Sequence, residues 1–345
     1  MAADTASPRM LGESASFLEM QEHVSLVAPL SKPVLIVGER GTGKELVASR
    51  LHFLSRRWEQ NFLKINCAAM SETLLEAQLF GHEAGAYTGA TKQRKGYFER
   101  ADGGTLFLDE LASTALPVQE KILRVIEYGE FERLGGNETL TVDVRIVAAT
   151  NEDLPRMARQ NRFREDLLDR LAFDVITLPP LRVRTDDIVI LAEHFAMGMV
   201  NQLGGELFAG FSPRVEKMLL NYHWPGNVRE LKNVVERAVY QHGEQLVTKL
   251  NFDPFESPYR PGKTAAAKTE KLDGEPDRAV SPLADGIVIP GDGSLDFKQA
   301  VKNFEINLIN EALKKAQFNQ KKAAEVLNLS YHQLRGYLRK YDLLG

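Results

Sequence analysis

The segment between residues 34 and 45 constrains the fold more than any other. An apolar, β-branched run from Val34 to Val37 leads into a glycine-rich stretch, and a pattern typical of a helix follows. The glycine-rich stretch consists of Gly38, Glu39, Arg40, Gly41, Thr42, Gly43, Lys44 and Glu45. Glycines let backbone N–H groups turn around a phosphate, and a helix N-terminus adds partial positive charge. The segment predicts a strand, a phosphate-binding loop and a helix, with Lys44 reaching the β- and γ-phosphates of a nucleotide.

Glu45 departs from the general form of such loops, in which a Ser or Thr at this place holds Mg²⁺. On this stretch alone, a glycine-rich turn at the start of a helix is the alternative. A second acidic element argues against it, because the apolar run Thr105–Leu108 ends in Asp109 and Glu110. Asp109 is placed to hold Mg²⁺, and Glu110 to orient and deprotonate an attacking water. An isolated Asp-Glu is usually only a polar strand end, but the two elements together predict ATP binding and hydrolysis.

Five short apolar runs alternate with helical patterns in the first half of the chain. The predicted strands are Val34–Val37, Phe62–Ile65, Thr105–Leu108, Val144–Ala149 and Asp174–Leu178, and the predicted helices include Lys44–Leu54, Ser71–Phe80 and Pro117–Tyr128. This alternation predicts a parallel α/β sheet whose ligand site lies at the carboxyl ends of the strands. Asn66, Thr150 and Asn151 follow two of these strands. They either contact the γ-phosphate or Glu110, or they cap a turn.

Changes in composition divide the chain into four predicted parts. Residues 1–180 form the α/β core, and residues 181–253 form a small helical domain with helices over Ile188–Leu203, Pro213–Tyr222 and Asn227–His242. Residues 254–296, with repeated Pro, Gly, Ala, Lys and Asp, are predicted to be a flexible linker. Residues 297–345 carry nine Lys and Arg against four Asp and Glu, a net charge of +5, whereas the whole chain carries −4. A small basic module therefore follows a larger acidic one.

The composition indicates a cytoplasmic protein. The only cysteine, Cys67, cannot form an internal disulfide, which fits a reducing compartment. Residues 1–10 lack the basic and apolar regions of a secretory signal. No apolar run approaches the length of a membrane span, so direct membrane insertion is not expected.

Residues 85–90 carry a resemblance to a known family. The stretch Gly85, Ala86, Tyr87, Thr88, Gly89 and Ala90 resembles the signature loop of bacterial enhancer-binding proteins, in which Gly-Ala-Phe-Thr-Gly-Ala is usual. These activators work with the sigma-54 form of RNA polymerase. Small residues on both sides make a mobile stalk, and an aromatic and a hydroxyl residue at its tip indicate a docking contact. A glycine-rich surface hairpin is the alternative, and Tyr87 departs from the usual Phe by a hydroxyl group that alters its hydration.

The two nucleotide elements resemble the same family. The phosphate loop is similar to the family's Gly-Glu-x-Gly-Thr-Gly-Lys-Glu, which itself has Glu at the place of Glu45. The segment that begins at Asn66 looks like the one that follows the second strand in this family. That resemblance implies that Asn66 links Glu110 to loop movement.

Two arginine-containing segments extend the resemblance. Residues 163–171 resemble the segment that carries arginine fingers, which implies that Arg164 and Arg170 reach the γ-phosphate bound by a neighbouring subunit. From the residues alone, these arginines are equally expected to form surface pairs with Glu165, Asp166 and Asp169. Residues 224–231 match the lid motif of the family, which implies that Arg229 senses nucleotide.

The resemblance runs from about Leu11 to Asp253 and again across the C-terminal module. It implies an AAA+ P-loop ATPase with a helical lid, with ATP and Mg²⁺ as cofactors. Fingers that act in trans require a homo-oligomeric ring, by resemblance a hexamer. The implied partners are sigma-54 RNA polymerase and upstream enhancer DNA. Only 37 residues precede Gly38, too few for a receiver or sensor domain, so control by a separate inhibitor protein is expected.

The C-terminal module is predicted to be a helix-turn-helix, and it resembles the Fis-type module of this family. Helices are predicted over Ala300–Ala316, Gln320–Leu327 and Tyr331–Tyr341, the first suited to packing or dimerisation. Ser330 is a good N-cap, and Asn328 can adopt the left-handed conformation for which the family usually has Gly. The second helix of such a motif enters the major groove. The expected base contacts are Tyr331, His332, Gln333 and Arg335, and the expected phosphate contacts are Lys321, Lys322, Arg339 and Lys340. A plain amphipathic tail is the alternative.

Three other functions compete with the predicted one. A general AAA+ remodelling enzyme would act without the sigma factor and would not need Tyr87 or Thr88. A DNA-binding regulator with a nucleotide switch would release no phosphate. A small-molecule kinase is the most distant, because nothing in the sequence resembles an acceptor pocket.

Overall fold

The computed structural model describes residues 10–87, 90–243, 245–256, 297–316 and 319–341. The chain divides into two compact units, Met1–Lys263 and Thr264–Gly345, and each is described by itself. Residues 257–296, which make up most of the predicted linker, lie outside the described residues. So do Thr88 and Gly89 of the signature loop.

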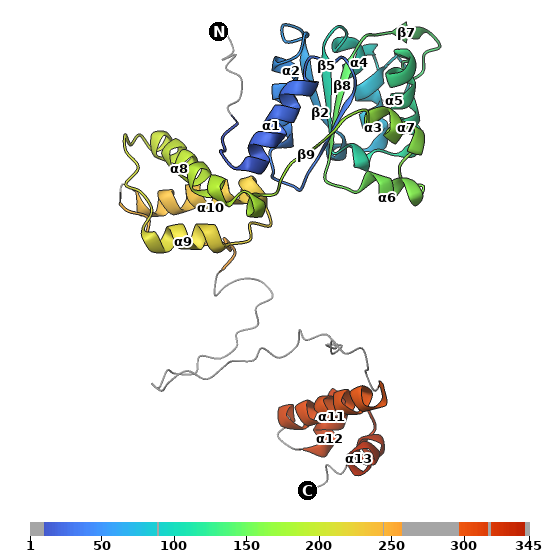
Figure 1. The fold of residues 1–345 in the computed structure, drawn as a ribbon. Helices are drawn as coiled ribbons and strands as arrows, with labels where there is room; N and C mark the ends of the chain where they lie inside the picture. Colours follow the sequence, from blue (N-terminus) through green and yellow to red (C-terminus); the bar gives the residue numbers. More distant parts are fainter. Residues whose placement is uncertain (1–9, 88–89, 244, 257–296, 317–318, 342–345) are drawn as a thin grey trace. The chain divides into compact units, whose positions relative to one another are not determined.

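A five-stranded parallel sheet forms the centre of the first unit (Figure 1). Its strands are β1 (Val34–Val37), β2 (Phe62–Asn66), β5 (Thr105–Asp109), β8 (Arg145–Thr150) and β9 (Val175–Thr177), in the order β2-β5-β8-β1-β9. All neighbouring strands run parallel. The predicted architecture and its five strands are confirmed, and the polar residues at the ends of β2, β5 and β8 lie at the same edge of the sheet.

Helices cover both faces of this sheet because its strands are apolar on both faces. The core on one face contains Val34 and Ile36 of β1 and is closed by α1 (Ala15–Val27) and α2 (Lys44–Phe53). The core on the other face contains Leu35. It is closed by α3 (Glu72–Phe80), α4 (Tyr97–Arg100), α5 (Leu116–Tyr128), α6 (Leu154–Arg159) and α7 (Glu165–Leu171). Successive residues of β1 therefore enter opposite cores, as the alternation of side chains along a strand requires.

Helix α1 and two small hairpins were not predicted. The buried residues of α1, Phe17, Met20, Val24 and Val27, have helical spacing that could have revealed it. One hairpin pairs β3 (Gly81–His82) with β4 (Arg94–Lys95), and the other pairs β6 (Glu130–Glu132) with β7 (Thr139–Thr141). Strands of two or three residues are too short to produce a recognisable alternation. The described residues of this unit also form three short 3₁₀ turns: η1 (Cys67–Ala69), η2 (Leu111–Ser113) and η3 (Leu181–Val183).

Three helices form the lid at the end of the first unit, and all three were predicted. They are α8 (Thr185–Gln202), α9 (Pro213–Asn221) and α10 (Asn227–His242). Their apolar faces make a separate core that includes Leu191, Leu219 and Leu231. Trp224 is fully buried in this core, and its indole Nε1 donates a hydrogen bond to the carbonyl of Leu219 (2.8 Å).

Replacement of Trp224 by Ala should lower the free energy of unfolding by about 3–5 kcal/mol, because the lost indole leaves a cavity in the lid core. It also leaves the Leu219 carbonyl without its donor. Urea unfolding followed by circular dichroism measures the change. Trp58 is 56% exposed, so Trp58→Ala is the matched control and should cost less than about 1 kcal/mol. Equal losses in the two variants would contradict the burial argument.

The second unit is a three-helix module. Its helices are α11 (Phe297–Lys315), α12 (Gln320–Val326) and α13 (Tyr331–Lys340), packed around a small core that includes Ile309, Leu313, Leu334 and Leu338. Asn328, between α12 and α13, has a φ of 53°, so it adopts the left-handed conformation that the sequence predicts. Among the described residues of the chain, no helix is both long and apolar enough to cross a membrane.

Candidate active site and interaction elements

The phosphate loop joins β1 to α2 and is shaped by two glycines with positive φ. Gly41 has a φ of 79°, and Gly43, the N-cap of α2, has a φ of 100°. The Lys44 Nζ donates hydrogen bonds to the carbonyls of Gly38 (2.8 Å) and Glu39 (3.2 Å), so the ammonium group lies within the curve of the loop. An ammonium group held there, at the N-terminus of a helix, suits a polyphosphate.

The two carboxylates at the end of β5 stand beside this loop. Asn66 and Asp109 are register partners in adjacent strands, and the Asn66 amide donates to the Asp109 carboxylate (3.4 Å). The Asn66 Oδ1 also accepts a hydrogen bond from the Ala68 backbone (2.9 Å), so the residue caps a turn and contacts the site at once. Of the two carboxylates, the one that accepts a hydrogen bond from the Asn66 amide is Asp109 and not Glu110. Glu110 has a φ of 53°, an uncommon conformation for a non-glycine residue and a frequent mark of functional sites.

The ionisable groups of this edge influence one another. Burial lowers the pKa of Lys44, while Asp109 and Glu110 act in the opposite direction. Burial is also the main cause that raises the pKa of Asp109. Burial, with the two carboxylates nearby, raises the pKa of Cys67 to about 12, so its thiol stays protonated and unreactive at neutral pH. A cation that approaches such a half-buried carboxylate stabilises its ionised form.

Two polar residues at the end of β8 lie near the loop. The Thr150 carbonyl accepts a hydrogen bond from the Gly38 backbone (3.2 Å), and the Thr150 hydroxyl accepts one from the Glu152 backbone (2.9 Å). The Thr150 side chain therefore forms a local turn. Asn151 lines a cavity together with Gly38 and Glu39.

The lid reaches the phosphate loop through the start of α10. The Arg229 backbone N–H donates to the Gly41 carbonyl (3.3 Å), and the positive charge of Arg229 contributes to the lowered pKa of Lys44. Arg229 is exposed, and its Cβ lies beside Gly41 of the loop. Glu45, in contrast, pairs with Lys64 of β2 (3.0 Å) at the surface.

A cavity of about 170 Å³ beside the loop was not predicted from the sequence. Three segments line it: the residues before and within α1, the loop and the start of α2, and the lid. The lining residues are Met10, Leu11, Phe17, Thr42, Gly43, Leu46, Arg184, Leu191, His194, Phe195 and Val228. A mostly apolar cavity next to a phosphate loop suits the base of a nucleotide. These residues lie too far apart in the sequence to form a recognisable motif.

Asp187 of α8 ties the N-terminal segment to the lid and so shapes this cavity. Its carboxylate is fully buried and accepts hydrogen bonds from the backbones of Glu13 (2.6 Å) and Ser14 (2.8 Å), and from the Ser14 hydroxyl (2.7 Å). Arg184 pairs with the same carboxylate (2.7 Å). Although burial opposes it, this set of partners lowers the pKa of Asp187.

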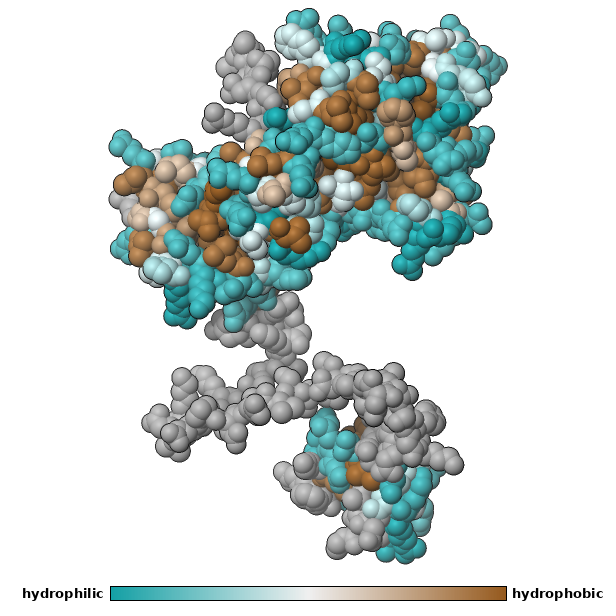
Figure 2. Space-filling model, viewed as in Figure 1, coloured by the Kyte–Doolittle hydropathy of each residue, from teal (hydrophilic) through white to brown (hydrophobic). Residues whose placement is uncertain are grey.

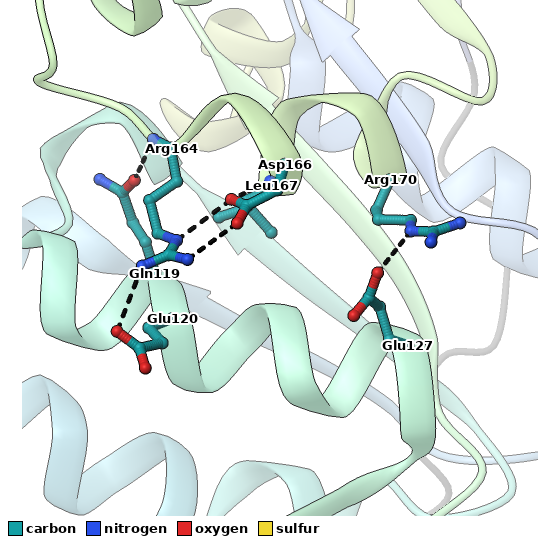
Figure 3. A network of polar contacts seen from close by, with 7 residues as sticks. All are labelled: Gln119, Glu120, Glu127, Arg164, Asp166, Leu167 and Arg170. Atoms are coloured by element: carbon teal, nitrogen blue, oxygen red, sulfur yellow. Dashed lines mark hydrogen bonds and ion pairs between the residues drawn. The ribbon is translucent and has the colours of Figure 1, made fainter.

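Arg164 and Arg170 lie on and beside α7, and both are held by carboxylates of the same chain (Figure 3). Arg164 makes two hydrogen bonds to Asp166 (2.8 and 3.1 Å) and one to Glu120 of α5 (3.2 Å). Arg170 is 61% exposed and pairs with Glu127 of α5 (2.6 Å). Of the surface partners that the sequence predicted, the structure has Asp166, while Glu120 and Glu127 were not foreseen. Neither arginine is among the residues that line the loop and carboxylate edge of its own chain.

The signature loop rises from the hairpin of β3 and β4, directly after α3. Gly85 has a φ of 84°, and its N–H donates to the Ala90 carbonyl (2.7 Å), which closes the base of the loop. The ring of Tyr87 lies edge-on to that of His82, with centroids 5.1 Å apart, and Tyr87 is 38% exposed.

Arg133 connects this base to the second hairpin. It pairs with Glu83 after β3 (2.9 Å) and with Glu99 of α4 (2.6 Å), and the Leu134 carbonyl accepts a hydrogen bond from the Glu83 backbone. These bonds raise the pKa of Arg133, with Glu99 the larger cause. The sequence offered no signal for this connection, because its members belong to three different elements.

The candidate DNA-binding helix begins as predicted. Ser330 and Gln333 form a capping box at the start of α13, in which the Ser330 hydroxyl accepts from the Gln333 backbone and the Gln333 Oε1 accepts from the Ser330 backbone (2.9 Å). The Ser330 cap is therefore confirmed, and the side chain of Gln333 is engaged in it. The other predicted contacts that are exposed are Lys321, Lys322, His332, Arg335, Arg339 and Lys340, whereas Tyr331 is half-buried.

The sheet, the phosphate loop, the carboxylates after β5 and the helical lid together define an AAA+ ATPase. Comparison with known families agrees: residues 10–177 match the sigma-54 interaction domain, residues 182–268 the AAA+ ATPase lid domain, and residues 300–341 the bacterial regulatory proteins of the Fis family. The chain belongs to the sigma-54-dependent transcription activators, which hydrolyse ATP and bind DNA. The predicted family and fold are confirmed.

Individual relatives support the same assignment. The chain is 54% identical to the Psp operon transcriptional activator of Escherichia coli (strain K12), an alignment that covers 97% of this chain and 98% of that protein. It is 41% identical to the Nif-specific regulatory protein of Azotobacter vinelandii, over 94% of this chain and 57% of that one. A crystal structure of NtrX from Brucella abortus in complex with ADP aligns with a TM-score of 0.67 and 30% identity, over 98% of this chain and 71% of that one. NtrX in complex with ATP aligns with a TM-score of 0.63 and 29% identity, over 96% of this chain and 69% of that one.

Proposed function

We propose that the chain converts ATP hydrolysis at the loop and carboxylate edge into movement of the signature loop against the sigma factor. The hydrogen bond between Asn66 and Asp109 carries this proposal. Asn66 ends β2, and the chain runs from it through η1 and α3 into the base of the loop. A change in the position of the carboxylates can therefore be transmitted through Asn66, η1 and α3 to Gly85–Ala90.

Each residue of the nucleotide site has a proposed role. Lys44 and the backbone of Gly38–Gly43 hold the phosphates, and Arg229 senses them from the lid. Glu110 activates the attacking water, and Asn66 links the nucleotide site to the signature loop. Thr150 and Asn151 form the border of the site at the end of β8. The purine lies in the cavity between α1, α2 and the lid. The half-buried carboxylate of Asp109 fits a cation, and we assign it as the protein ligand of Mg²⁺, which neutralises phosphate charge when bound.

Self-association into a ring, a hexamer by family, completes the site. Arg164 and Arg170 lie on an exposed face where they can serve the nucleotide of a neighbouring subunit. A cavity beside Arg170 is lined by Tyr128 and Phe173, which are 66% and 54% exposed. Apolar surface also gathers in patches on the visible face of the first unit (Figure 2). Exposed apolar patches of this kind are typical of association surfaces.

The second unit binds upstream enhancer DNA as a dimer. His332 and Arg335 of α13 are the proposed base contacts, with Tyr331 and Gln333 at the helix start, and the exposed Lys321, Lys322, Arg339 and Lys340 contact phosphates. Ser330 supports them through its cap. The target proposed from the Escherichia coli relative is a phage-shock operon, which responds to membrane stress. We propose control in trans by an inhibitor of the phage-shock protein A type, a location in the cytoplasm, and domain boundaries at residues 180, 253 and 296.

Replacement of Thr88 by Ala should abolish open-complex formation on a sigma-54 promoter while leaving ATPase activity within about twofold of wild type, because the hydroxyl belongs to the docking tip and not to the nucleotide site. The measurement pairs a promoter-opening assay with phosphate release. Ser25→Ala, on the outer side of α1, should change neither activity. Full promoter opening by Thr88→Ala would refute the docking role, and opening that needs no sigma-54 would favour a general AAA+ remodelling enzyme.

A further inference from the structure

Glu39 is an acidic residue of the phosphate loop, and its side-chain contacts are with residues of the lid and of the turn that leads into it. The Glu39 carboxylate accepts two hydrogen bonds from the Arg182 guanidinium, at 2.6 and 2.8 Å. It accepts a third from the amide of Asn227 (3.0 Å). Arg182 belongs to η3, which leads into the lid, and Asn227 is the first residue of α10. A loop that binds phosphate is therefore joined to the lid by side chains as well as by the Arg229 backbone.

Asn227 is held rigidly in this arrangement. It is fully buried and has a φ of 51°, a conformation that Asn tolerates better than most residues. Its Oδ1 accepts a hydrogen bond from the Leu181 backbone (2.8 Å), and its Nδ2 donates to both Glu39 and the Arg40 carbonyl (3.0 Å each). One amide thus joins η3, α10 and two successive residues of the loop.

The backbones of the loop and the lid also lie in direct contact. A Cβ atom placed on Gly41 would lie 2.3 Å from the Gly226 carbonyl oxygen and 3.0 Å from the Cβ of Arg229. The loop and the start of α10 are therefore in close contact and cannot approach each other further at this point. Arg229 follows Asn227 by two residues, so a change in Asn227 shifts the position of Arg229.

The energetic contribution of the ion pair to folding is expected to be small, because both side chains are partly exposed to water. A bidentate pair nonetheless fixes the relative orientation of the two side chains, since the planar guanidinium engages both carboxylate oxygens. The hydrogen bonds from Arg182 and then Asn227 lower the pKa of Glu39 to about 2, so the carboxylate is ionised at any working pH. The arrangement therefore sets orientation and not overall stability.

We propose that Glu39 is a positioning residue, through which Arg182 and Asn227 couple the orientation of the lid to the shape of the phosphate loop. The proposal rests on the nucleotide site described above. The Glu39 carboxylate touches no phosphate in this role. It holds the lid in the orientation that places Arg229 beside the loop, and it is the link that lid movement must break when nucleotide leaves.

The test uses the full chain and compares Glu39→Gln, Arg182→Gln and the double variant in ATPase and nucleotide-binding assays. Glu39→Gln keeps the shape of the side chain but loses its charge and one of its two acceptor oxygens, so it cannot accept the bidentate pair from Arg182. It should raise KM for ATP about tenfold and weaken ADP binding by a similar factor, measured with a fluorescent ADP analogue, while kcat changes less than about threefold. The double variant should be no worse than either single variant, because both remove the same link.

Asp143→Asn is the matched control, since Asp143 pairs with Arg57 (2.7 Å) before β8, at the amino end of the sheet. It should leave KM and ADP affinity unchanged. Thermal midpoints close to wild type in all variants would separate positioning from a folding defect. A KM within twofold of wild type in Glu39→Gln, or effects of the single variants that add in the double variant, would overturn the proposal. Absence of ATPase activity in the wild-type chain would instead refute the nucleotide site itself.

Discussion

Glu110→Gln should lower the rate of ATP hydrolysis by about 10²–10⁴-fold and leave ATP affinity within about threefold of wild type. Glu110 directly follows Asp109, the last residue of β5, and its charge acts on Lys44. In the proposed mechanism it takes a proton from the water that attacks the γ-phosphate. Gln has the same size and can still orient a water, but it cannot accept its proton at neutral pH. The left-handed backbone at Glu110, with a φ of 53°, is unaffected by the change of side chain. Phosphate release and equilibrium binding of an ATP analogue measure the two quantities.

A loss of promoter opening should accompany the loss of hydrolysis in Glu110→Gln, because both depend on the same step. Glu72→Gln, an exposed carboxylate in the first turn of α3, is the matched control and should retain full activity. If Glu110→Gln hydrolysed ATP at the rate of wild type, Glu110 could not be the base, and a different carboxylate or a bound water chain would have to supply it. Asp109 would then be the residue to test next.

The elements of this site that sequence reasoning predicted are those in which one short segment contains the whole signal. The phosphate loop is such a case, because a strand, three glycines, Lys44 and a helix start follow one another within residues 34–45. The carboxylates after β5 are another. Their meeting at one edge could also be predicted, since the carboxyl ends of parallel strands lie together. The αL turn at Asn328 and the Ser330 cap were predictable for the same reason: each depends on the conformational preference of one residue.

The features that could not be predicted depend on contacts between segments far apart in the chain. Glu39 and Arg182 are separated by 143 residues, and Ser14 and Asp187 by 173. Nothing in the local sequence around Glu39 distinguishes a side chain that contacts phosphate from one that contacts the lid. The cavity proposed for the purine has the same origin, because it exists only where α1, α2 and the lid meet.

From the residues alone, Arg164 and Arg170 are either members of surface ion pairs or arginine fingers, whereas the family resemblance implies fingers. Both arginines are paired with carboxylates of their own chain, yet the pairs are exposed and therefore weak. A γ-phosphate carries more negative charge than Glu127 or Asp166 and can compete for either guanidinium. The existing pairs are thus compatible with arginines that change partner when a neighbouring subunit brings ATP.

Arg170→Ala should lower ATPase activity about 10³-fold or more in the assembled protein, since a finger in trans contributes roughly 10³–10⁵ to the rate. The chain's own ATP affinity should change little, because Arg170 pairs with Glu127 on α5 and not with the loop (Figure 3). Glu127→Gln should retain activity, as it removes only the resting partner. Arg159→Ala, an exposed arginine at the end of α6, is the matched control.

Mixing two inactive variants decides between action in trans and action in cis. In an equal mixture of Arg170→Ala and Glu110→Gln chains, a finger from a Glu110→Gln subunit can meet the intact carboxylate of an Arg170→Ala neighbour. Random assembly in a closed ring makes about a quarter of the interfaces competent, so activity should return to about that fraction of wild type. If Arg170 instead served the nucleotide of its own subunit, every site in the mixture would lack either the finger or the base, and no activity would return. The recovered fraction therefore reports whether a complete catalytic site needs two copies of this chain.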